Sequence, residues 1–208
     1  MNIKSLILLP AASLLFAACE NHADKTTKAT VKDAVEVTAS TSAQGVKYVL
    51  SSNSEILFVG SKVTGSHNGG FKSFTGSFTV ADHALVGGGQ RIVIDMNSLW
   101  TDTEKLTGHL KSEDFFNVAK NPQATFELTK LNSVAAEQFE VSGNLTLNGT
   151  TKNITFPATA SLADGKAKVH AKFNINRKDF GIIYAGKADD LIRDEVVLEL
   201  KLEAAPEA

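Results

Sequence analysis

Few residues of this 208-residue chain combine a reactive side chain with the spacing that catalysis requires. His109 and Asp114 come closest to an acid–base pair, because on a short helical segment two side chains five positions apart can face one another. A nucleophile would also need an activating base and an orienting third group, and the chain has no GxSxG elbow and no paired-carboxylate signature. The sequence therefore predicts no catalytic residue and a protein that is not an enzyme.

Metal ions, cofactors and nucleic acids are not expected partners. The histidines lack the short paired spacings of a metal site, since they are scattered at His22, His67, His83, His109 and His170. The formal net charge is −2, and no basic run interleaved with aromatic residues is present to form a nucleic-acid groove.

The first residues have the organisation of a secretory signal. Lys4 precedes an uncharged run from Leu6 to Ala18 that ends in small residues, so residues 1–18 are predicted to be a signal peptide. The run LFAAC resembles a bacterial lipobox and places the chain's single cysteine, Cys19, at the cleavage position. Cys19 is then a lipidation site that anchors the chain to a bacterial membrane as a periplasmic or surface lipoprotein of the cell envelope. The alternative is an ordinary secreted protein with one free thiol.

The segment after the cysteine has too little apolar surface to fold alone. It has no aromatic residue from Glu20 to Ala43 and is rich in Thr, Ala, Lys, Ser, Asp and Glu, so residues 19–43 are predicted to be the lipidated cysteine and a flexible tether. In the alternative interpretation, Val31 to Val37 form a short helix or strand docked on the domain.

Apolar and polar residues alternate along most of residues 44–205, which are predicted to form one domain. Alternation of this kind is typical of antiparallel strands with one buried face. It is clearest at Phe139, Val141, Gly143, Leu145 and Leu147, at Val169, Ala171, Phe173 and Ile175, and at Val196, Leu198, Leu200 and Leu202. Asn148-Gly149 and Asp164-Gly165 predict tight turns between strands, while Gly65 to Gly70 (GSHNGG) predict a loop. About eight strands favour an all-β barrel or sandwich.

One short helical region interrupts the strands near residues 102–118. Thr101 and Glu104 have the spacing of a capping box, which predicts a helix that starts near Asp102. Ser112 is predicted to cap a further turn. Phe115 and Phe116 then point in different directions, so that one can seal a core while the other faces a ligand.

Five runs together resemble the YceI-like family of bacterial periplasmic polyisoprenoid-binding proteins. In chain order they are FKSFTGSF (71–78), HLKSEDFFNV (109–118), NPQATF (121–126), GNLTLNGTTKNITF (143–156) and FNINRKDFGI (173–182). The resemblance covers about residues 46–203 and implies an extended, lipocalin-like antiparallel β-barrel of about eight strands. It also implies a polyisoprenoid, quinone-like or fatty ligand in an apolar channel, and a possible homodimer.

The resemblance also decides how the 12 phenylalanines are interpreted. By residue type alone they are explained by a filled core, whereas a hollow barrel would use them as an apolar lining for a lipid. The expected lining is Phe58, Phe74, Phe78, Ile92, Ile94, Phe115, Phe116, Phe126, Leu128, Phe173, Ile175 and Phe180. His109 and Arg177 are candidate contacts to an anionic headgroup. Arg177 has an alternative structural role in which it pairs with Asp179, Asp114 or Glu113.

The leading hypothesis is thus a non-catalytic carrier of a long apolar amphiphile, tethered to the cell envelope. The alternative is a solid-cored envelope stress or surface protein that acts through a protein partner.

Overall fold

The computed structural model describes residues 21–37, 44–81 and 84–207. The predicted signal peptide, Cys19 and residues 38–43 of the predicted tether lie outside the described residues.

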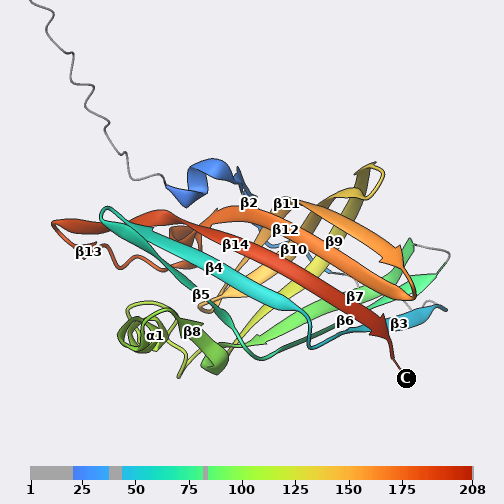
Figure 1. The fold of residues 1–208 in the computed structure, drawn as a ribbon, viewed down its shortest axis with the longest axis horizontal. Helices are drawn as coiled ribbons and strands as arrows, with labels where there is room; N and C mark the ends of the chain where they lie inside the picture. The colour runs from blue at the N-terminus through green and yellow to red at the C-terminus, as the bar shows by residue number, and fades with distance from the viewer. Residues whose placement is uncertain (1–20, 38–43, 82–83, 208) are drawn as a thin grey trace, which may run out of the picture.

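Eight antiparallel strands form a closed ring. The ring runs β12–β11–β10–β9–β7–β6–β3–β14 and is closed by the pairing of β14 with β12 (Figure 1). Its strands are β3 (Val46–Leu50), β6 (Phe74–Ala81), β7 (Ala84–Asp95), β9 (Gln123–Ala135), β10 (Gln138–Leu147), β11 (Thr150–Ala163), β12 (Lys166–Asn176) and β14 (Asp190–Pro206). This architecture confirms the predicted all-β, lipocalin-like barrel with one short helical region.

The long strand β14 joins this ring to a second group of strands. One edge of β14 pairs with β12, and its other edge pairs first with β4 and then with β3. Beyond β4 the sheet continues through β5 to β8. The elements outside the ring that follow β3 are β4 (Glu55–Lys62), β5 (Gly65–Phe71), η2 (Met96–Ser98), β8 (Leu99–Thr101), α1 (Glu104–Lys111), η3 (Arg177–Phe180) and β13 (Gly186–Lys187).

Both predicted hairpin turns are confirmed. Asn148 and Gly149 have φ angles of 49° and 74° and connect β10 to β11. Asp164 and Gly165 have φ angles of 53° and 71° and connect β11 to β12. Positive φ at both central residues matches the twist of the flanking strands, which is why these residue pairs occur there.

The predicted loop at GSHNGG is instead strand β5. Gly69 lies where a Cβ atom would be 2.3 Å from Cζ of Phe58, so this glycine lets the Phe58 ring pack against the backbone of β5. The glycines in this run therefore allow close packing within a strand. The residue types alone do not distinguish such a strand from a loop.

The helix forms where it was expected, but its ends differ from the prediction. Thr103 is the N-cap of α1 and makes no side-chain capping bond, while the Thr101 hydroxyl donates to the Thr103 carbonyl at 2.7 Å. The predicted capping box of Thr101 and Glu104 is therefore wrong. Ser112 ends α1, since its hydroxyl donates to the carbonyl of His109 at 2.8 Å, and turns follow it.

The predicted flexible tether is wrong for residues 21–37, which pack on the barrel and are called the strap below. The strap contains η1 (His22–Lys25), β1 (Thr27–Lys28) and β2 (Thr30–Asp33). β1 pairs in parallel with β12, and β2 pairs in antiparallel with β11. The docked-segment alternative is thus the closer description, because β2 overlaps it at residues 31–33 and Val35 exchanges two hydrogen bonds with the Asn144 side chain.

The strap fills a seam in the barrel wall. Direct pairing of β11 with β12 extends only from Thr159–His170 to Ala163–Lys166. Beyond that point the two strands separate, and β1 and β2 pair with their free edges. The segment cannot fold alone, but here its backbone groups complete an existing sheet and its buried Ala29 joins the core around Phe173.

The side chain of Asn174 holds the strap in place. Its Nδ2 donates to the Ala23 carbonyl at 3.2 Å, the Thr26 carbonyl at 3.2 Å and the Thr26 hydroxyl at 3.0 Å. Asn174 is 3% exposed, so its removal leaves acceptors without their donor.

We predict that Asn174→Ala lowers the free energy of unfolding by about 1–3 kcal/mol, the usual cost of unsatisfied buried polar groups. It should also increase proteolytic cleavage within residues 21–37, as read by limited proteolysis and mass spectrometry. Asn132→Ala is the control, because Asn132 Nδ2 donates to the exposed Glu140 carboxylate. Equal cleavage of the two variants would show that Asn174 does not hold the strap.

Glu199 on the outer face of β14 predicts a pH dependence. Hydrogen bonds from His170 and Lys172 hold the pKa of its carboxyl below the usual 4.5, against the opposing effect of burial. The folded state therefore favours the charged form, and this contribution to stability is present above pH 4.5 and is lost as the pH falls through the lower, folded-state pKa.

We expect Glu199→Gln to reduce the free energy of unfolding at pH 7 by less than about 1 kcal/mol, because the pair is partly exposed. The difference from the parent should vanish at acid pH in urea titrations made at several pH values. Glu104→Gln, on the exposed start of α1, is the control. A difference that stays constant from neutral to acid pH would contradict this assignment.

Candidate functional site: an apolar cavity inside the barrel

The barrel encloses a cavity of about 500 Å³. Side chains from β4, β7, β9, β10, β11, β12 and β14 form its wall, and α1 with the residues after it covers one side. The cavity reaches the barrel end that carries the β4–β5 hairpin, β13 and α1 (Figure 1). Four of its polar lining residues belong to this end and are called the mouth below: Lys62, His67, Lys187 and Asp190.

Eight of the residues expected to line an apolar channel do line this cavity. They are Phe58, Ile92, Ile94, Phe115, Phe116, Phe126, Phe173 and Ile175. A hollow barrel is therefore observed where the residue types alone favoured a filled core. Whether these side chains contact a ligand stays a prediction.

Four expected lining residues lie elsewhere. Phe78 stacks on Tyr48 with ring centroids 5.6 Å apart, in a packed cluster with Ala167 and Ala204. Phe74 packs beside Met96 and Val118. Parts of the barrel interior are thus filled by side chains, which alternation along a strand cannot reveal.

The other two corrections have local causes. Phe180 is 0% exposed in η3 and belongs to the core cluster with Ala29 and Phe173. Leu128 is half-buried beside a register shift between β9 and β10, where Gly143 pairs with Leu128 and Ser142 pairs with Lys130. The shift follows Leu128 directly, and the β9 residues that line the cavity, Ala124 and Phe126, all precede it.

An aromatic stack forms the centre of the apolar wall. Phe156 lies parallel to Phe173 with centroids 4.0 Å apart, and Phe126 lies 5.8 Å from Phe156. The prediction omitted Phe156, although it ends one of the quoted motifs. It also omitted several aliphatic lining residues whose period-two spacing was the available signal: Leu145, Ile154, Val196, Leu198, Leu200 and Leu202.

His109 and Tyr184 close one side of the cavity. The His109 ring contacts Phe115 and Tyr184 edge-on at centroid distances of 5.0 and 5.1 Å. Its Nε2 lies 2.9 Å from an Asp114 carboxylate oxygen, so these two residues do face one another. Because Asp114 occupies one ring nitrogen, His109 offers a ligand its ring and at most its other nitrogen.

The mouth carries two hydrogen-bonded pairs. Lys62 bonds to Asp190, and this contact holds the pKa of the Asp190 carboxyl below its usual value. His67 Nδ1 lies 2.8 Å from Asp102. Burial opposes ionisation of Asp102, but the bonds from His67 and the Asn68 backbone hold its pKa below the usual value.

Arg177 has a structural role. It is 4% exposed and donates to the carbonyls of Ile182 at 2.7 Å and Arg193 at 3.1 Å, and to Asp194 at 3.2 Å. The predicted pairing of Arg177 with Asp179, Asp114 or Glu113 is wrong, because its carboxylate partner is Asp194. The guanidinium borders the cavity, but these bonds leave it poorly placed as a headgroup contact.

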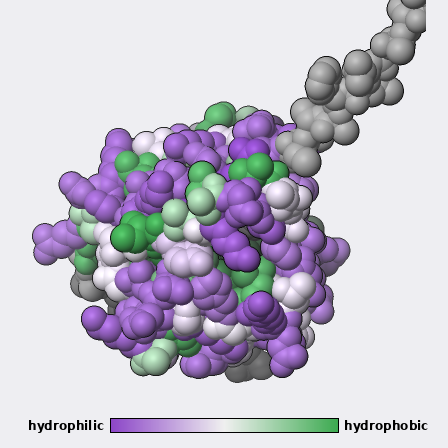
Figure 2. All heavy atoms as spheres, turned by 90° about the vertical axis from the view of Figure 1, so that its left-hand side faces the viewer, coloured by the Kyte–Doolittle hydropathy of each residue, from purple (hydrophilic) through white to green (hydrophobic). Residues whose placement is uncertain are grey.

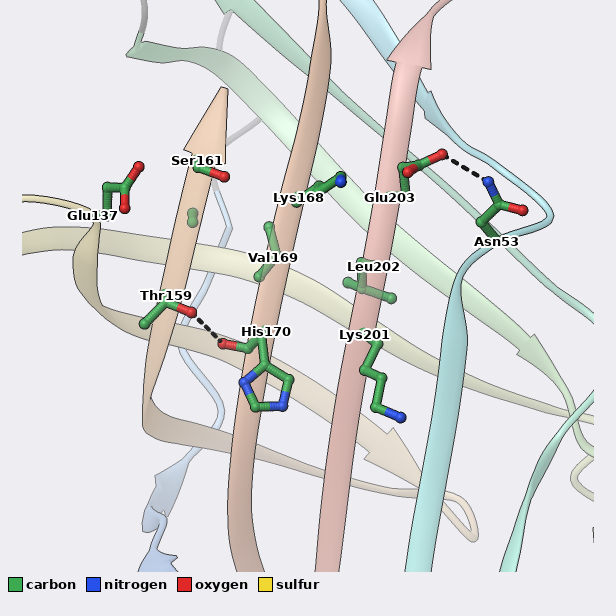
Figure 3. A pocket seen from close by; sticks show the side chains of 11 residues that line it. Asn53, Glu137, Thr159, Ser161, Lys168, Val169, His170, Lys201, Leu202 and Glu203 are labelled. Carbon is green, nitrogen blue, oxygen red and sulfur yellow. Dashed lines mark hydrogen bonds between the residues drawn. The ribbon is translucent and has the colours of Figure 1, made fainter. Parts of the chain in front are cut away.

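A second hollow of about 330 Å³ lies on the outside of the barrel (Figure 3). Two of its charged side chains pair with residues outside the hollow, Glu203 with Lys166 and Lys201 with Glu55, and Glu203 also accepts a hydrogen bond from Asn53. Val169 and Leu202 line both hollows, so the β12–β14 wall separates them. In the part of the chain that the structure describes, no group of three His, Cys, Asp or Glu residues could hold a metal ion.

The Phe126 ring is fitted against Gly143, which gives a test of the wall. A Cβ at Gly143 would lie 2.2 Å from Cζ of Phe126. We expect Gly143→Ala to lower the free energy of unfolding in urea by about 1–3 kcal/mol, as overpacking does. Gly60→Ala is the matched control on β4, because its added methyl meets nothing within 4 Å. An equal change in the two variants would contradict the packing.

A closed β-barrel of eight strands with an apolar chamber defines the class of lipocalin-like barrel proteins. The chain belongs to the YceI-like family, because the model of the YceI-like domain matches residues 48–204. It is 38% identical over 120 residues to a UPF0312 protein of Yersinia pestis (strain Pestoides F), with 55% of this chain and 62% of that protein covered. A UPF0312 protein of Enterobacter sp. (strain 638) is 39% identical over 121 residues, also covering 55% and 62%. The chain thus spans less than two thirds of the length of these relatives.

Solved structures show the same fold. Burkholderia cenocepacia BcnA superposes with a TM-score of 0.65 at 22% identity, covering 73% of this chain and 96% of that one. A polyisoprenoid binding domain from Saccharophagus degradans, described as implicated in plant cell wall breakdown, has a TM-score of 0.65 at 21% identity and coverages of 78% and 99%.

Proposed function

We propose that this protein is a non-catalytic carrier that holds a long apolar amphiphile, such as a polyisoprenoid, an isoprenoid quinone or a fatty lipid, inside its barrel. The observation that carries the proposal is the cavity of about 500 Å³. Its wall is mostly aromatic and aliphatic, and its charged groups other than the buried Arg177 gather at the mouth. This arrangement matches a ligand with an apolar tail and a polar head.

The affinity of such a ligand would come from burial. Each methylene removed from water contributes about 0.8 kcal/mol, so a chain of several isoprene units can bind without specific hydrogen bonds. The rings of Phe126, Phe156 and Phe173 present the smooth apolar surface that this requires. The polyisoprenoid binding domain of S. degradans, which shares the fold, supports the same ligand class.

Two alternatives from the sequence have less support. A solid-cored protein is not the structure observed, because the cavity occupies the barrel. An enzyme would need a nucleophile beside His109 and Asp114, and the groups around the His109 ring are the aromatic rings of Phe115 and Tyr184.

The carrier is proposed to work in the cell envelope of a bacterium, anchored through lipidated Cys19. The support is the signal-like run of residues 1–18 and the lipobox-like LFAAC. Within the described residues, no helix has the length and apolar character needed to cross a membrane.

Native mass spectrometry of residues 21–208, purified without detergent, is the direct test. A stoichiometric long-chain lipid, identified after organic extraction, is the expected result. A protein that is empty and also refuses added farnesol would overturn the carrier function. The same spectrum reports whether two chains associate, as the family resemblance implies.

Filling the cavity should weaken binding without unfolding the barrel. Leu198 faces Phe58 and Phe173 across neighbouring strands and lines the cavity. We expect Leu198→Trp to lower the affinity for a fluorescent farnesol analogue at least about tenfold, equivalent to about 1.4 kcal/mol. Lys201→Trp, at an exposed position of the same strand, should bind like the parent. Unchanged affinity in a folded Leu198→Trp variant would place the ligand elsewhere.

A further inference from the structure

We propose that the mouth end of the barrel rests directly on the bilayer surface, so that the cavity opens against lipid. The proposal rests on the membrane anchor at Cys19 given above and adds the face of the protein that meets the membrane. Four observations support it: the length of chain before the strap, the site where the strap begins, the exposed side chains at the mouth end and the pairing of its charges.

The strap leaves very little chain between the anchor and the barrel. Described structure begins at Asn21, whose side chain caps η1, and only Glu20 separates it from Cys19. Two fully extended residues span about 7 Å at most. A flexible tether over residues 19–43 would have let the barrel stand clear of the headgroups, but a docked strap holds it beside them.

The strap begins near the mouth. The His22 Nε2 atom lies 3.4 Å from the Ser66 hydroxyl, on the hairpin that joins β4 to β5. Lys62 and His67, which contribute to the mouth, lie on the same two strands. The proposed anchor is therefore attached close to the end of the barrel where the cavity opens. The β9–β10 turn lies at the opposite end (Figure 1).

Three aliphatic side chains are exposed at this end, on separate segments. Val63 in the β4–β5 turn is 53% exposed, Ile183 in the loop before β13 is 72% exposed, and Leu191 at the start of β14 is 49% exposed. The Val63 amide donates to the Leu191 carbonyl at 3.1 Å, so two of the three segments are held together. Figure 2, which looks onto this end, shows apolar side chains between the polar ones.

Two ion pairs lie at this end, so we expect its contact with the bilayer to involve little electrostatic attraction to the headgroups. Lys62 pairs with Asp190, and Lys178 pairs with Asp194 at 2.8 Å. Shallow insertion of Val63, Ile183 and Leu191 would remove apolar area from water, the term that drives interfacial binding. The contact should therefore depend weakly on salt.

The orientation has a consequence for loading. An amphiphile that leaves the bilayer would enter the cavity at the mouth without exposing its apolar chain to water. On the opposite orientation the chain would have to cross water along the full length of the barrel, which opposes transfer because apolar surface is costly to hydrate.

Single tryptophan substitutions test which face meets the membrane. The mature chain from Cys19 is coupled through this single thiol to a maleimide phospholipid in vesicles whose acyl chains are brominated and quench nearby tryptophan. Every variant keeps Trp100, so the quantity compared is the fraction of tryptophan fluorescence lost in brominated relative to unbrominated vesicles. This fraction should be larger for Ile183→Trp than for the parent. Val134→Trp is the matched control, since Val134 is 68% exposed at the end of β9, far from the mouth. It should match the parent.

A larger quenched fraction for Val134→Trp than for the parent, or equal quenched fractions for Ile183→Trp and the parent, would overturn the proposal. A flexible Gly/Ser insertion of about 20 residues between Glu20 and Asn21, which reaches roughly 25 Å, tests the role of the short linker. It should reduce quenching of Ile183→Trp, and undiminished quenching would contradict that restraint. Vesicle coupling does not require a bound ligand, so failure of this orientation is distinguishable from failure of the carrier function, which the extraction and farnesol measurements report.

Discussion

Closure of the barrel by the pairing of β14 with β12 is the constraint on which the rest of the structure depends. Once the ring is closed, inward side chains from facing strands share one interior, and the mutual distance of the walls decides whether they meet or leave a cavity. In the cluster of Tyr48 and Phe78 they meet. Around Phe173 and Leu198 they leave an apolar chamber.

The strap shows how closure is completed by residues outside the family domain. The YceI-like domain model begins at residue 48, whereas β1 and β2 lie between residues 27 and 33. They supply hydrogen bonds to the edges of β11 and β12 where these strands separate, and unpaired strand edges are unfavourable. The wall of the cavity and the position of the proposed membrane anchor therefore depend on the same short segment.

The polar groups near the cavity follow a consistent arrangement. Arg177 is buried and its hydrogen bonds go to backbone carbonyls and Asp194, so it stabilises the turn after β12. The mouth pairs, Lys62 with Asp190 and His67 with Asp102, keep these polar groups outside the apolar interior. Burial of unpaired charge would be costly, and this cost explains why the buried guanidinium of Arg177 is hydrogen-bonded while Lys62 and Asp190 pair at the mouth.

The sequence by itself determined most strands of the ring and the two tight turns, because alternation and the Asn-Gly and Asp-Gly pairs act over a few residues. It also placed most of the lining, from Phe58 to Ile175. It did not reveal β5, whose glycines also fit a loop. Tertiary structure alone decided that Phe78 fills the interior while Phe156 lines a cavity, that Gly69 packs under Phe58, and that residues 21–37 complete the wall. Each of these depends on the distance between segments remote in the chain, which local pattern does not encode.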